Sequence, residues 1–313
     1  MKHAVHLAVL AAALALLSGC GHICRHPCEH SAPVAPPPRT LADARSWCLY
    51  YGASTTDIVE RLGGYDLVVI DAKALGGTAS NTIARLKSKG CLVAGYLSMF
   101  EVARWHRYRS RIPREWYLTV DGKPWSPWAG KDVSWDDNLV ASFAEPGWRE
   151  MLVGLVKSEV LDYGCDGVFM DTLEDLDFAT LPAAERPRQL EGMRQLLAAL
   201  DETYPKAFFI ANRTLQGTLP VAAPYLDALC WESFAPKYFE DPPTRAWMDG
   251  VSRNIEAQRE KYPFVKLSLM DSDKSAADIP TTQAKMRAIS AERGYVPYCT
   301  VGGYSALPPL PTK

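Results

Sequence analysis

The sequence predicts a single-domain α/β protein built as a (β/α)8 barrel, and three observations support this. Apolar segments of strand length alternate with longer amphipathic segments from residue 46 to residue 313. The strand-length segments are hydrophobic almost throughout, as expected of parallel strands buried on both faces. Eight of them over about 250 residues fit a closed barrel. A doubly wound open sheet is the alternative, but no glycine-rich dinucleotide loop follows the first expected strand.

Residues 1–19 have the layout of a secretory signal. Lys2 precedes an apolar stretch from Ala4 to Leu17, which is too short to span a membrane comfortably. The segment Leu17-Ser-Gly-Cys20 resembles the lipobox of bacterial lipoproteins, which implies cleavage before Cys20 and lipidation of its sulfur. We therefore expect a lipid-anchored protein of the bacterial cell envelope, in the periplasm or at the outer membrane. The alternative is an ordinary signal peptide in which Cys20 has no such role.

Residues 20–45 are rich in proline and hold little that could form a core, so we expect a tether between lipid and barrel. Cysteine and histidine alternate in this segment, and such side chains could ligate a soft or borderline metal ion. A Cys24–Cys28 disulfide and a simply solvated tail are the alternatives, and both are favoured over metal binding. The alternating residues are His22, Cys24, His26, Cys28 and His30.

The composition of the chain limits the kinds of partner and bound group that we expect. The chain has 8 cysteines, so lipidation of Cys20 would leave an odd number in an oxidising compartment. Five cysteines lie in or beside expected strands, where small buried hydrophobes are the default interpretation: Cys48, Cys91, Cys165, Cys230 and Cys299. A net charge of -2 and a pI near 6.3 leave no basic footprint for nucleic acid. We expect a monomer that uses no cofactor and no metal.

The expected elements follow in chain order. Strands are predicted at residues 47–51, 66–71, 92–97, 167–171, 207–211, 226–232, 265–270 and 296–300. Helices are predicted at residues 80–89, 147–163, 188–204, 245–262 and 281–293. An unusually long connection at residues 98–146 contains Trp105, Trp116, Trp125, Trp128 and Trp135. Long loops in compact domains are commonly functional. We expect most of these indoles to fold the loop onto the barrel and one or two to contact a glycan.

The fourth expected strand runs directly into a group of carboxylates between Asp171 and Asp177. In parallel α/β proteins the residues just beyond a strand's carboxyl end line the ligand site. Asp171 is therefore the first catalytic candidate. The structural alternative is that Asp171 and Thr172 cap a helix.

Other strand ends carry polar residues that the barrel would bring to the same face. Clustering like charges costs free energy that folding alone does not demand, which favours a functional site. These residues are Asp71, Glu101, Asn212, Arg213, Glu232, Asp271, Asp273 and Tyr298. The expected barrel contains one histidine, His106, so histidine-assisted hydrolysis and histidine-rich zinc sites are disfavoured. Carboxylate chemistry points first to glycoside hydrolysis, with a metal-dependent hydrolase using Asp171, Glu174 and Asp175 as an alternative.

Several of these segments resemble the endo-α-1,4-polygalactosaminidase family, glycoside hydrolase family 114. They are Asp66-Leu-Val-Val-Ile-Asp71, Gly95-Tyr-Leu-Ser-Met-Phe-Glu101, Tyr163-Gly-Cys-Asp-Gly-Val-Phe-Met-Asp171 and Trp231-Glu232-Ser233. The resemblance implies a TIM barrel that cleaves internal bonds of an α-1,4-linked galactosamine polymer. It makes Asp171 the nucleophile and Glu232 the general acid/base. Phe100 before Glu101 and the long tryptophan-rich loop depart from the family pattern.

We expect retention through a double displacement, with a raised pKa at Glu232. The sugar would be bound by Asp71, Glu101, Asn212, Asp271, Asp273 and Tyr298. A carboxylate-rich mouth would attract the cation of a free galactosamine amine and repel uronic polymers. The rival from another class is a glycan-binding lipoprotein that has the barrel but no turnover.

Overall fold

A computed structural model describes residues 40–130, 133–275, 277–306 and 309–310, which belong to one unit that runs from Pro38 to Lys313. The signal peptide, Cys20, most of the tether and the alternating Cys/His residues lie outside the described residues and remain predictions. No helix within the described part of the chain is long and apolar enough to cross a bilayer.

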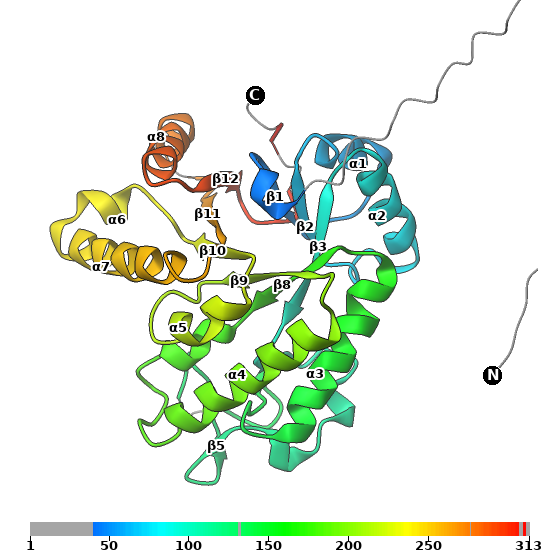
Figure 1. The fold of residues 1–313 in the computed structure, drawn as a ribbon, viewed down its shortest axis with the longest axis vertical. Helices are drawn as coiled ribbons and strands as arrows, with labels where there is room; N and C mark the ends of the chain where they lie inside the picture. The colour runs from blue at the N-terminus through cyan, green and yellow to red at the C-terminus, as the bar shows by residue number, and fades with distance from the viewer. Residues whose placement is uncertain (1–39, 131–132, 276, 307–308, 311–313) are drawn as a thin grey trace, which may run out of the picture. The chain divides into compact units, whose positions relative to one another are not determined.

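In the described part of the chain, eight parallel strands form one sheet in the order β1-β2-β3-β8-β9-β10-β11-β12 (Figure 1). Their bounds are β1 Trp47–Tyr50, β2 Leu67–Ile70, β3 Leu92–Ser98, β8 Gly167–Asp171, β9 Phe208–Asn212, β10 Ala228–Glu232, β11 Val265–Ser272 and β12 Val296–Val301. The first and last strands meet: the Trp47 indole donates to the Val296 carbonyl (2.9 Å), and the Tyr51 N–H donates to the Tyr304 carbonyl (2.8 Å). The sheet is thus a nearly closed (β/α)8 barrel, which confirms the predicted fold class and all eight predicted strands.

Within the described residues, eight α-helices follow or connect the strands. Their bounds are α1 Thr56–Leu62, α2 Ala79–Ser88, α3 Pro146–Glu159, α4 Arg186–Thr203, α5 Leu219–Ala222, α6 Lys237–Glu240, α7 Pro242–Arg259 and α8 Ile279–Glu292. Proline in the first turn starts α3, α4, α7 and α8, where its missing N–H would have no helical partner. The five predicted helices are confirmed, whereas α1, α5 and α6 were not predicted.

The predicted helix at residues 147–163 is shorter than expected. It ends at Glu159, and Val160 leaves helical geometry before a 3-10 turn at Leu161–Tyr163. Val160 is fully buried, and its side chain occupies the space where a Cβ on Gly95 of β3 would lie, at 2.6 Å. Packing of this side chain on the strand accompanies the break.

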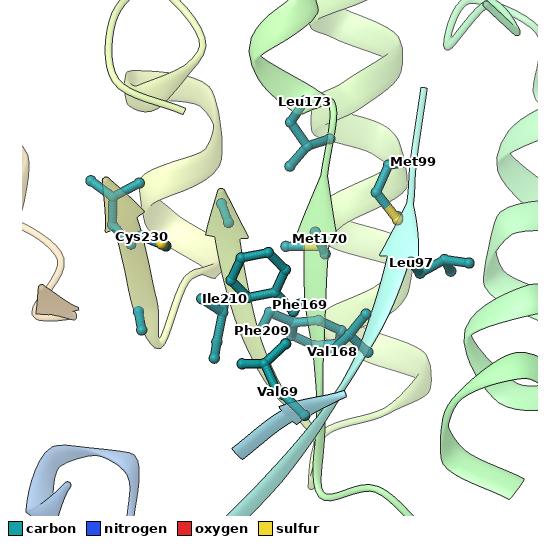
Figure 2. Close-up of a cluster of buried hydrophobic side chains, with 14 of the residues drawn as sticks. Val69, Leu97, Met99, Val168, Phe169, Met170, Leu173, Phe209, Ile210 and Cys230 are labelled. Carbon is teal, nitrogen blue, oxygen red and sulfur yellow. The ribbon is translucent and has the colours of Figure 1, made fainter. Parts of the chain in front are cut away.

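The barrel strands supply the core, because their residues are buried on both faces. Figure 2 shows part of it, with Val69, Leu97, Phe169, Ile210 and Cys230 contributed by five neighbouring strands. The five strand cysteines are all buried, as predicted.

The loop between β3 and α3 folds into two small antiparallel pairs. β4 (Glu101–Val102) pairs with β7 (Leu139–Val140), and β5 (Thr119–Val120) pairs with β6 (Lys123–Pro124). Asp121 and Gly122 at the β5–β6 turn both have positive φ, as tight hairpin turns require. Trp116, Trp125 and Trp135 are buried or half-buried, whereas Trp105 and Trp128 are 69% and 65% exposed. Most of the indoles thus pack within the fold, as predicted, whereas contact of Trp105 or Trp128 with a glycan stays a prediction.

Candidate active site

Three neighbouring strands end in polar side chains: β8 in Asp171, β9 in Asn212 and β10 in Glu232. The residue after each has a positive φ angle: Thr172 (70°), Arg213 (50°) and Ser233 (62°). This conformation costs a non-glycine residue about 1 to 2 kcal/mol. Strained residues of this kind cluster at functional sites, where surrounding structure holds them in place. The strain marks these three strand ends as the centre of the site.

Asn212 joins the two carboxylates. Its Nδ2 lies 2.9 Å from Asp171 Oδ1 and 2.7 Å from Glu232 Oε2, so one amide group donates to both. Since both oxygens contact the same nitrogen, they are less than about 6 Å apart. The structure thus brings Asp171, Asn212 and Glu232 together.

Tyrosines hold the other oxygen of each carboxylate. The Tyr96 hydroxyl donates to Asp171 Oδ2 (2.9 Å), and the Tyr304 hydroxyl donates to Glu232 Oε1 (2.7 Å). The Tyr51 ring packs edge-on against both, with centroid distances of 5.1 Å to Tyr96 and 5.9 Å to Tyr304. Burial raises the pKa of all three phenols well above its usual value, so they remain donors. Both carboxylates are therefore fixed in orientation.

The pair is electrostatically coupled. Burial raises the pKa of Asp171, hydrogen bonds from Asn212 and Tyr96 act in the opposite direction, and the Glu232 charge raises it. A second negative charge this close makes ionisation of Asp171 harder than that of an isolated carboxyl group. Such a pair can hold one proton and one negative charge, which is the state that acid-assisted glycoside hydrolysis starts from.

Further carboxyl groups lie behind the pair. Burial, and then the Asp171 charge, raises the pKa of Glu174 well above its usual value, and Arg213 Nε lies 3.9 Å from its Oε1. Burial raises the pKa of Asp175 to about 10, and its protonated carboxyl donates to Glu101. Glu101 Oε1 also accepts the Trp128 indole N–H at 2.9 Å. Glu101 is thus joined to the exposed Trp128 and to the buried Asp175.

Within the described residues no group of three His, Cys, Asp or Glu side chains is arranged to hold a metal ion. Asp171, Glu174 and Asp175, the trio considered for a metal-dependent reaction, instead contact Asn212, Arg213 and Glu101 respectively.

Two cavities flank the pair. One of about 430 Å³ is lined by Glu232, Glu174, Arg213 and Trp247. The indole of Trp247 is 46% exposed and meets Trp231 edge-on at 6.2 Å. The other cavity, of about 260 Å³, is lined by residues including Asp71, Tyr96, Trp105 and His106. Because Tyr96 contacts Asp171 and Glu232 lines the first cavity, the carboxylate pair lies between the two.

The remaining predicted residues take different positions. Asp71 lines the second cavity, and its Oδ1 accepts from the N–H groups of Lys73 and Ala74. Asp271 accepts from the Gly303 N–H with both oxygens, which fixes the residue before Tyr304. Asp273 is in an exposed turn, where its carboxylate accepts from Ser275.

Tyr298 is not brought to the pair, contrary to expectation. It is 3% exposed and packs against Trp47 and Tyr65 at the amino-terminal ends of β1 and β2, the opposite end of the barrel. Tyr304, six residues later, reaches Glu232 instead. Tyr96, Tyr304 and Trp247 were not predicted from the sequence as residues of the site. The Gly302-Gly303 pair was the available signal in the sequence for a tight turn before Tyr304, and both glycines have positive φ in the structure.

Comparisons with known proteins agree with this architecture. The glycoside hydrolase domain of PelA from Pseudomonas aeruginosa superposes with a TM-score of 0.65 at 20% identity, over 85% of this chain and 98% of that one. Ega3 of Aspergillus fumigatus, solved in complex with galactosamine, gives 0.53 at 14% identity over 82% and 91%. The α-galactosidase TtGalA from Thermus thermophilus gives 0.53 at 14% identity over 86% and 60%.

These structural similarities show a shared fold. No curated protein sequence matches the chain. The model of glycoside-hydrolase family GH114 matches residues 28–238, more than half of the 313 residues, and the chain therefore belongs to this family of glycoside hydrolases.

Proposed function

We propose that the enzyme cleaves internal glycosidic bonds of an α-1,4-linked, galactosamine-containing polysaccharide, with Asp171 as nucleophile and Glu232 as general acid/base. The observation that carries the proposal is the single Asn212 amide that donates to both carboxylates. It holds the nearest oxygens of the two carboxyl groups within about 6 Å of each other, which supports the short separation of retaining glycosidases, roughly 5–5.5 Å, over the wider gap that leaves room for water.

In the first step Glu232 gives its proton to the glycosidic oxygen, and Asp171 attacks the anomeric carbon as the bond to that oxygen breaks. In the second step Glu232 takes a proton from water, and the water oxygen displaces Asp171 from the sugar. Asn212, Tyr96 and Tyr304 keep the carboxyl groups oriented through both steps.

The carboxyl groups of the site support an amino-sugar substrate. A free galactosamine amine is a cation, and its charge would stabilise the ionised forms of Asp171 and Glu174, whose pKa values are raised by burial. Within the described residues Glu174 Oε2 and Asn212 Oδ1 are buried without a hydrogen-bond partner, so they are acceptors that a hydroxyl or ammonium group could use. Galactosamine is also the ligand named for the structurally similar Ega3.

The two flanking cavities support cleavage within a chain. A polymer lying across the pair would place sugars in both, with Trp247 on one side and Trp105 on the other. Indole faces stack on the apolar faces of pyranose rings. An enzyme that acted only at chain ends would need one side closed.

The proposal is tested by product release from partly deacetylated α-1,4-galactosaminogalactan. We expect oligosaccharides from the wild-type chain and at least a roughly 100-fold loss in Asp171→Asn and Glu232→Gln, because each removes a reacting group. Asp201→Asn and Glu202→Gln, exposed on α4, are the matched controls and should retain activity. Full activity in either site variant would show that the assignment is wrong.

A further inference from the structure

A dense group of cations lies in the insertion, beside the proposed cleavage site. Five arginines occur between residues 104 and 114: Arg104, Arg107, Arg109, Arg111 and Arg114. Among the described residues none of the five forms an ion pair with a carboxylate. Like charges repel, so a cluster without counter-ions stabilises the fold poorly and is suited to an anion from outside.

Four of the arginines line one cavity of about 440 Å³: Arg104, Arg107, Arg109 and Arg114. Arg109 is held in place by two backbone carbonyls, that of Asp137 (2.6 Å) and that of Trp135 (2.8 Å). The Arg114 guanidinium lies over the Trp135 ring, 3.8 Å from its centroid. The arginines thus share one shallow cavity that is open to solvent.

His106 adds a neutral donor to this cavity. Its Nδ1 accepts from the Ala103 N–H (3.2 Å) and contacts the Tyr108 hydroxyl (2.8 Å), which leaves the proton on Nε2. Burial, and then the nearby Lys73 charge, lowers the pKa of His106. The lowered pKa favours the neutral ring, which can act as a donor through Nε2 without adding charge.

The arginine cavity adjoins the cleft. His106 and Arg107 line both it and the 260 Å³ cavity that reaches Tyr96, the residue bonded to Asp171. A glycan that leaves the cleft on the Tyr96 side would pass directly into the arginine cavity.

We propose that the arginine cavity binds the carboxylate groups of an acidic saccharide, such as a polymer containing uronic acid. Guanidinium groups match carboxylates with two parallel hydrogen bonds, whereas ammonium groups do not. The position of the site, which shares His106 and Arg107 with the neighbouring cavity of the cleft, favours a glycan over a membrane surface. The enzyme would then cut a cationic segment in its acidic cleft while holding an anionic saccharide close by. The inference rests on the proposed function only in treating the neighbouring cavity as part of the glycan cleft.

Calorimetry with a hexamer of α-1,4-linked galacturonic acid tests the proposal. The titration uses the full chain carrying Glu232→Gln, so that cleavage plays no part and a failed cleavage assignment would not affect the result. We expect saturable binding that weakens with added salt and falls about tenfold or more when Arg104→Gln and Arg114→Gln are added. The matched pair Arg253→Gln and Arg287→Gln, on α7 and α8, removes the same charge and should leave the affinity unchanged.

Several results would overturn the inference. They are no binding of the hexamer, equal binding of neutral maltohexaose, or undiminished binding after loss of Arg104 and Arg114. A different result would assign the cluster to an anionic membrane surface instead. In that case phosphatidylglycerol vesicles would bind the protein but not its Arg104/Arg114 variant, and the hexamer would not bind.

Discussion

Asp175 carries a buried proton at neutral pH. Its side chain is 1% exposed, burial raises its pKa to about 10, and the charges of Glu174, Glu101 and Asp171 act in the same direction. In the unfolded chain an aspartate ionises near pH 4. Between these values the folded state binds one more proton than the unfolded state. The stability that Asp175 supports is therefore present at low pH and declines as pH rises towards 10.

Asp175→Asn should accordingly flatten the pH dependence of stability. The amide is neutral, has the same shape and can still donate to Glu101. We expect the free energy of unfolding of the wild type to fall more steeply from pH 5 to pH 9 than that of the variant, by up to ~1.4 kcal/mol per pH unit. Urea unfolding at several pH values measures this. Parallel curves for the two proteins would show that Asp175 is not protonated in the folded state.

Two tyrosines show which features of single residues can be predicted from the sequence and which cannot. Tyr298 was correctly placed in the last strand, but strand position alone did not tell at which end of the barrel its ring would lie. Tyr304 follows a turn through Gly302 and Gly303 that is secured by Asp271, 32 residues away from Gly303. Contacts of that range cannot be predicted from local pattern. Asp171 and Glu232 could be predicted to lie on one face of the barrel because each ends a continuous apolar strand.

At the scale of elements, α7 brings Trp247 to the rim of the larger cavity. We expect Trp247→Ala to raise KM for the polymer roughly 5–10-fold with a smaller change in kcat, because losing a stacking surface costs about 1 kcal/mol or somewhat more. Steady-state kinetics with the polymer measure both constants.

Tyr262 gives the matched control. It is an exposed aromatic residue just beyond α7, at 38% exposure, and it lines neither of the two cavities. Tyr262→Ala should leave KM unchanged. Equal effects of the two substitutions would remove Trp247 from the sugar site.

The eight strands were predictable because burial on both faces makes each one apolar almost throughout. The short helices α5 and α6, four residues each, were not, because so few residues carry no amphipathic period. The strand pairing inside the tryptophan-rich insertion could not be predicted from the sequence either. Its pairing of β4 with β7 joins residues nearly forty positions apart. The sequence marked the insertion as functional but did not reveal its arginine cavity.

At the scale of the whole molecule, we propose that the barrel is tethered to a bacterial membrane through lipid on Cys20. The Leu-Ser-Gly-Cys segment motivates the proposal. Cys20→Ala should move the protein from the membrane fraction to the soluble fraction of its host without altering the activity of the purified enzyme. A protein that stays with the membrane after this change is not held by that lipid.

The proposed mechanism depends most on one arrangement, in which the Asn212 amide donates to two carboxylates a short distance apart. The most direct test is the anomeric configuration of the first sugar released from the galactosamine polymer, followed by proton NMR before mutarotation. A double displacement at Asp171 predicts the α anomer, as in the substrate. Initial formation of the β anomer would mean that water attacks directly, and it would contradict the assignment of Asp171 as nucleophile.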